Sequence, residues 1–121
     1  MHVADWHLAR SGNFQLIGSA RLITGESFRF LPLFCSHDEA QQYCRQSGLW
    51  HQGIRPRHNY FVSGGAEQEM TGFEELVTQA VHAGAVAVGV FIGFNDSHES
   101  CWEYFRASNA TELLPESERP V

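Results

Sequence analysis

The densest group of basic side chains in this sequence is Arg55, Arg57 and His58. Arginine carries a permanent charge and a planar fork of donors that matches the oxygens of a carboxylate or a phosphate. Pro56 interrupts the surrounding segment, and the sequence predicts an irregular loop over residues 49–57, where binding residues are common. Arg55, Arg57 and His58 are therefore the candidate ligand-binding residues. The alternative is that they only balance an acidic surface.

A cysteine and a histidine two residues apart, Cys35 and His37, stand where a helix is expected to begin. The helix dipole would lower the pKa of a thiol there, and a neighbouring imidazole could act as its base. Together with Cys44 the pair could instead ligate zinc. However, the sequence lacks the Cys-x-x-Cys and His-x-x-x-His spacings of metal sites, and Cys44 falls on the apolar face of the helix. We therefore predict no catalytic residue, no metal site and no cofactor, with Cys35 packed at the end of a strand.

The overall composition limits the classes of partner. The 121 residues carry a formal net charge of −6, and all eight basic residues are arginine. An acidic chain repels phosphate backbones and anionic lipid at long range, so we expect neither nucleic acid nor membrane as a partner. The absence of lysine excludes Schiff-base catalysis. Three cysteines without a repeated spacing, and an N-terminal segment without a signal-peptide pattern, predict a cytoplasmic protein with reduced thiols.

Two helices are well marked in the sequence. Ser36 and Glu39 have the spacing of a capping box, which predicts a helix over residues 37–47, followed by a glycine as its stop. Residues 71–74 repeat that spacing ahead of an apolar stripe with helical periodicity, which predicts a second helix. A start of this second helix near Ala66 is the alternative.

The remaining apolar segments predict strands. Residues 85–92 form a continuous apolar run, typical of a buried central strand, and residues 101–106 alternate, as in a strand that pairs back on it. Further strand candidates are residues 14–17, 20–24, 27–34 and 59–62. The order of elements predicts an α+β fold, with a mixed, mainly antiparallel sheet of about five strands and both helices packed on one face. We expect a single domain over residues 1–106 and a flexible C-terminal tail over residues 107–121.

The alternation in residues 101–106 places Trp102 and Tyr104 on one side of that strand. If this side faces outward, the two rings form an exposed aromatic patch, and such patches mark contacts between proteins. The alternative is that a helix covers the two rings. Trp102 and Tyr104 are therefore the candidate interface residues.

Two segments carry a likeness to a known family. In residues 30–40 a strand with a Pro-x-Phe element runs into a serine-capped helix, and a helix over residues 73–83 precedes a strand that ends at Asn95. Both segments, about a quarter of the chain, resemble the N-terminal domain of the SseB-like (enhanced serine sensitivity) proteins. Residues 94–97 depart from the Asn-Pro-Gly-like turn of that family. The resemblance implies a small α/β module and carries over no catalytic residue.

These observations favour a non-enzymatic module that binds a protein or a ligand and forms a homodimer. An alternative is a small enzyme or a binder of anionic ligands that uses the segment 55–58 with Cys35 and His37. An aromatic patch at a symmetric contact would mark the first class, whereas a cleft in which arginines and a histidine converge would mark the second. A third alternative is a structural zinc protein, which would contain metal and unfold on chelation.

Overall fold

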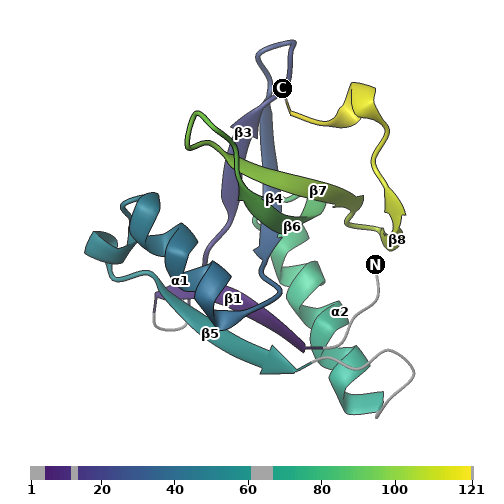
Figure 1. Cartoon of the computed structure of the whole chain (residues 1–121). Helices are drawn as coiled ribbons and strands as arrows, with labels where there is room; N and C mark the ends of the chain where they lie inside the picture. The colour runs from purple at the N-terminus through teal and green to yellow at the C-terminus, as the bar shows by residue number, and fades with distance from the viewer. Residues whose placement is uncertain (1–4, 12–13, 61–66, 121) are drawn as a thin grey trace.

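The computed structural model describes residues 5–11, 14–60 and 67–120, which form eight strands and two α-helices (Figure 1). The strands are β1 (Asp5–Ser11), β2 (Phe14–Gln15), β3 (Gly18–Arg21), β4 (Ser27–Leu33), β5 (Arg55–Tyr60), β6 (Ala87–Phe94), β7 (Ser100–Arg106) and β8 (Asn109–Leu113). The helices are α1 (His37–Gln46) and α2 (Glu67–His82), with short 3-10 turns η1 (Leu49–Gln52) and η2 (Glu116–Glu118). No helix among these residues is long and apolar enough to cross a membrane.

The larger sheet has five strands in the order β3-β4-β6-β7-β8. Only the β4–β6 pair is parallel, and the other three pairs are antiparallel. The parallel pair encloses α1, β5 and α2 in the chain, as a crossover connection requires. The predicted α+β class, with a mixed and mainly antiparallel sheet of five strands and two helices, is confirmed.

A second, three-stranded sheet in the order β2-β1-β5 was not expected from the sequence. It joins the larger sheet at one bridge between His7 and Phe34. The amide of His7 donates to the carbonyl of Phe34, and the carbonyl of His7 accepts from the amide of Phe34, both at 2.9 Å. The antiparallel pair β1–β5 is called the ribbon below.

Both predicted helices are present. Oγ of Ser36 accepts a hydrogen bond from the amide of Glu39 at 3.1 Å, which confirms the predicted N-cap of α1. Gly48 follows the helix with a φ of 74°, a conformation that glycine adopts without strain. The second helix passes through residues 71–74, so the earlier of its two predicted starts describes it better than the capping-box spacing.

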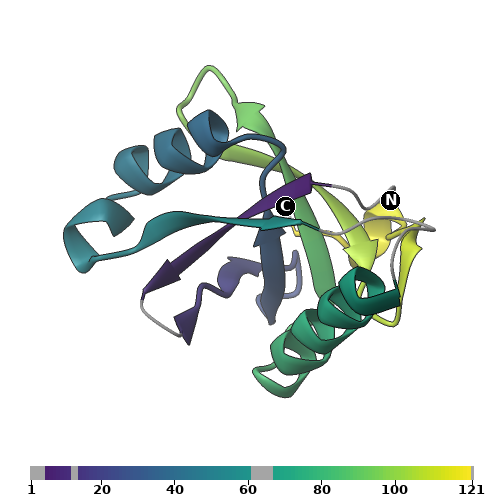
Figure 2. The same cartoon turned by 90° about the horizontal axis from the view of Figure 1, so that it is seen from below.

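The two helices cover opposite faces of the five-stranded sheet, which corrects their expected placement on one face (Figure 2). Leu76 of α2 packs in a cluster with Leu31 and Val88. Cys44 of α1 packs in another cluster with Phe91. Because side chains alternate along a strand, positions 88 and 91 of β6 belong to different faces. A strand that is apolar at every position has two apolar faces, and each needs its own cover.

The segment expected to be a tail contributes a strand to the sheet. Within residues 107–120, β8 pairs with β7, and Leu114 is buried beside it. Nε of Arg119 donates to the carbonyl of Leu114 at 2.7 Å. Arg106 forms ion pairs with Glu112 at 3.2 Å and with Glu118 at 2.8 Å. These contacts extend the folded unit past the boundary at residue 106.

Candidate functional site

The candidate ligand-binding residues lie on a strand, which corrects their expected position in a loop. Residues 55–60 form β5, and the irregular segment before it ends at Ile54. The predicted strand over residues 59–62 overlaps only the end of β5, because proline is depleted in strands and Pro56 stands at the second position of β5. A strand fixes the relative directions of Arg55 and Arg57, which a loop would leave open. His58 also belongs to β5, but its side chain lies outside the described part of the structure.

The backbone of β1 decides which groups of β5 face outward. His7 directs its amide and carbonyl to Phe34, away from β5. Because these directions alternate along an antiparallel pair, Arg55 and Arg57 turn their backbone groups toward β1. Pro56 then turns outward, where its missing N–H costs no hydrogen bond within the sheet.

Arg10 is a candidate binding residue that the sequence did not single out. In the register of the ribbon Arg10 lies opposite Arg55, and Leu8 lies opposite Arg57. Residues directly opposite share a face, with Cβ atoms about 4.5–5.5 Å apart, so the three arginines occupy one face. Among the described residues no carboxylate pairs with them, and Nε of Arg10 is buried without a hydrogen-bond partner. Like charges placed in this way repel each other, and an anion between them would relieve that repulsion.

Trp50 of η1 holds two guanidinium groups in place. The guanidinium carbon of Arg55 lies 3.9 Å from the centre of the indole ring, and that of Arg45 lies 4.4 Å from it. Nη1 of Arg55 also donates to the carbonyls of Trp50 at 2.6 Å and Ile54 at 3.2 Å. Each cation–π contact contributes about 0.5–1 kcal/mol at an exposed site and reduces side-chain freedom. The name arginine cluster is used below for Arg10, Arg45, Arg55 and Arg57.

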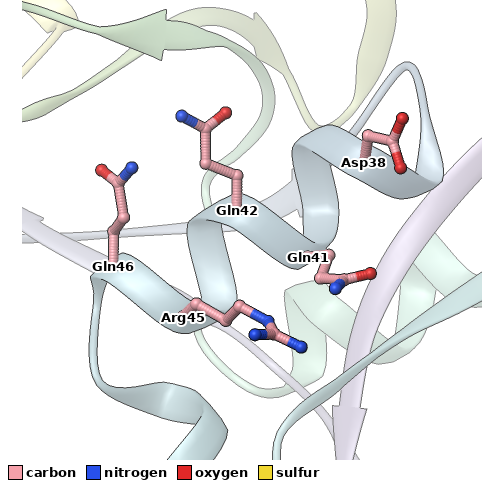
Figure 3. Close-up of a pocket in the computed structure, with 5 residues that line it drawn as sticks. All are labelled: Asp38, Gln41, Gln42, Arg45 and Gln46. Carbon is pink, nitrogen blue, oxygen red and sulfur yellow. The ribbon is translucent and has the colours of Figure 1, made fainter.

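Arg45 also borders a shallow depression on the exposed side of α1. The other lining residues are Asp38, Gln41, Gln42 and Gln46. Figure 3 shows that these side chains project in different directions from the helix and do not meet at a common point. The depression is therefore the polar surface of an amphipathic helix, and it supplies neutral amides beside Arg45.

The environment of Cys35 opposes the formation of a thiolate. Cys35 is exposed, which corrects its expected packing at the end of a strand. The remaining burial raises the pKa of the Cys35 thiol above its ordinary value, and the carboxylates of Glu39 and Glu103 raise it further. The expected lowering by the helix dipole is therefore outweighed. Cys44 is fully buried in the apolar core, as predicted. No group of three metal-ligating side chains occurs in the part of the chain that the structure describes.

We expect Cys35 to be alkylated slowly, because a raised pKa leaves less thiolate at neutral pH. In a Cys101→Ser background, the rate with iodoacetamide at pH 8 should be below that of N-acetylcysteine. The rate should still be rising with pH above pH 9. A plateau below pH 8, with a rate above that of the free thiol, would instead identify a nucleophilic cysteine.

The structure bears on the two alternatives for Trp102 and Tyr104, an exposed aromatic patch or rings that are covered. Tyr104 is 8% exposed, and Trp102 is half-buried. The Trp102 ring lies 4.9 Å from the ring of Phe30 and 5.3 Å from that of Tyr43 in α1. Leu114 packs on the same aromatic cluster from the C-terminal side. Burial raises the pKa of Tyr104 to about 12, as a dry environment would.

No protein-family model matches this chain, and no curated protein or solved structure shows a significant match to it. The resemblance of residues 30–40 and 73–95 to the SseB-like proteins stays a prediction.

Proposed function

We propose that this protein is a binding module that captures a carboxylate- or phosphate-bearing partner on the arginine cluster. The observation that carries the proposal is the cross-strand pair of Arg10 and Arg55, with Arg57 on the same face. Three arginines on one face of the ribbon, with Arg45 linked to Arg55 through the ring of Trp50, form a positive feature in a chain with a net charge of −6. Such a feature attracts anions selectively.

The geometry of the cluster supports binding more than catalysis. Stacking on Trp50 and hydrogen bonds to backbone carbonyls hold Arg55 in place, so less side-chain entropy is lost when an anion binds. Arginine is too weak an acid to exchange protons at neutral pH. Cys35, the expected nucleophile of the enzymatic alternative, carries a raised pKa. The proposed role is therefore non-enzymatic and would be exercised in the cytoplasm, in keeping with the free thiols of Cys35, Cys44 and Cys101.

Loss of one cluster arginine is expected to weaken anion binding about tenfold, because a charge-assisted hydrogen bond contributes about 1.5–3 kcal/mol. The measurement is an NMR titration of the wild type and of Arg57→Gln with inorganic phosphate and with citrate. The wild-type affinity should also fall with added sodium chloride, since exposed charges are screened.

Arg21→Gln is the matched control for this experiment. Arg21 is an exposed arginine of β3, and its Nη1 donates to the carbonyl of Gly25 at 2.9 Å. The substitution removes the same charge from the other sheet, so binding should be nearly unchanged. Equal losses in Arg21→Gln and Arg57→Gln would mean that only net charge matters. In that case the proposed site is wrong.

A further inference from the structure

The outer edge of β5 is open in the described part of the structure. β5 is the last strand in the order β2-β1-β5, and no described strand pairs with its other side. Figure 1 shows β5 along the lower margin of the molecule. The helix α1 packs on a face of the ribbon through Ala40 and Cys44, which cluster with Ala9 of β1. Among the residues that the structure describes, no strand therefore occupies this edge.

The register of the ribbon defines which backbone groups this edge presents. His7 lies opposite His58 and directs its own amide and carbonyl to Phe34. The amide and carbonyl of His58 therefore point away from β1, as do those of Tyr60. Pro56 presents only a carbonyl. An incoming strand would find two donors, at residues 58 and 60, and the carbonyls between Pro56 and Tyr60.

The arginines beside this edge indicate which side chains an incoming strand should carry. Arg55 and Arg57 stand two residues apart on one face, which separates them by about 6.6 Å along the strand. A neighbouring strand repeats its side chains with the same period. Carboxylates at alternate positions of that strand would therefore match both arginines at once, and Arg10 lies directly across from Arg55.

We infer that the natural partner of the arginine cluster is an extended acidic segment of another protein, which adds as a strand to the outer edge of β5. Acidic side chains at alternate positions face Arg55 and Arg57, and backbone hydrogen bonds form with His58 and Tyr60. The inference rests on the proposed function, since the same arginines supply the charge. The inference adds backbone pairing at the strand edge, which the binding of a free phosphate would not require.

The decisive variant is His58→Pro, compared with His58→Ala. Proline removes the outward N–H of residue 58 but leaves the hydrogen bonds between β5 and β1 intact, whereas alanine keeps that N–H. The probe is a fluorescent peptide with the sequence Glu-Val-Glu-Val-Glu-Val, measured by anisotropy beside its glutamine counterpart. We expect His58→Pro to weaken peptide binding about tenfold relative to His58→Ala, with phosphate binding equal in both variants.

Amide exchange in the wild type gives a second test that does not depend on the folding of the proline variant. Bound peptide should protect the amides of His58 and Tyr60 from hydrogen exchange, because both would become hydrogen-bonded. Peptide binding of equal strength in the two His58 variants, or no protection of these amides, would overturn the strand-addition inference. If phosphate binding by the arginine cluster persisted, the proposed function would stand. Loss of neither ligand in Arg57→Gln would instead reject the proposed function itself.

Discussion

The substitution Phe30→Ala is expected to lower the free energy of unfolding by about 3–5 kcal/mol, the range for an aromatic residue removed from a packed core. Phe30 of β4 is 3% exposed. Its ring lies 5.2 Å from the ring of Tyr104 and 4.9 Å from that of Trp102. Guanidinium-induced unfolding, followed by tryptophan fluorescence, measures the effect.

The neighbours of Phe30 explain why the loss should fall at the upper end of that range. Its ring lies over two glycines, Gly18 of β3 and Gly89 of β6. A Cβ atom on Gly89 would come within 2.6 Å of the Phe30 ring and within 3.3 Å of Trp102. These glycines offer no side chain to refill the space, so the cavity left by Phe30→Ala would persist.

Two variants test this account of Phe30. Phe30→Leu keeps much of the volume and should cost clearly less than Phe30→Ala. Ile23→Ala removes a side chain that is 86% exposed and should change stability by less than about 0.5 kcal/mol. If Phe30→Ala cost no more than Ile23→Ala, the ring would not be packed over the glycines as described.

The elements that the sequence predicted well are those whose signals are local. The start of α1 depends on Ser36 and Glu39, three residues apart, and one hydrogen bond between them fixes it. The central strand β6 follows from an uninterrupted apolar run. Such signals act between neighbours in the chain and do not depend on the rest of the fold.

The elements that were missed, or predicted only at one end, depend on distant partners. β5 contains a proline and two arginines, and it is a strand because β1, about fifty residues earlier, pairs with it. β8 has only an alanine and a terminal leucine as apolar residues, and the single buried Leu114 that follows is too little to predict a strand. The division of the helices between two faces also follows from the three-dimensional pairing and not from the pattern of either helix.

The candidate site was predicted in part. The cluster of charge identified Arg55 and Arg57, but nothing in the linear sequence connects them to Arg10. Arg45 and Trp50 belong to the candidate site because η1 reverses the chain after α1. The indole ring of Trp50 thereby contacts Arg45 of the helix and Arg55 of the strand. A charge pattern in the sequence can therefore suggest a candidate site, whereas the strand register determines which residues lie beside it.

The double variant Trp102→Ser/Tyr104→Ser tests whether these rings serve the core or an interface. We expect it to lower the free energy of unfolding by more than about 4 kcal/mol, because both rings are packed against Phe30. A domain of this size has a total free energy of unfolding of about 5–15 kcal/mol, so the variant should lose a large part of its stability and unfold at a lower denaturant concentration. Circular dichroism and light scattering on the same samples measure folding and mass together.

Tyr104→Phe is the matched control for this variant. It keeps the ring packed and removes only the hydroxyl, so it should change stability by about 1 kcal/mol or less. A contrary result is a wild-type dimer that the double variant converts to a stably folded monomer, which would place the two rings at a contact between copies. The ring distances favour the first outcome. A residue such as Tyr104, 8% exposed within one chain, has little surface left for a partner.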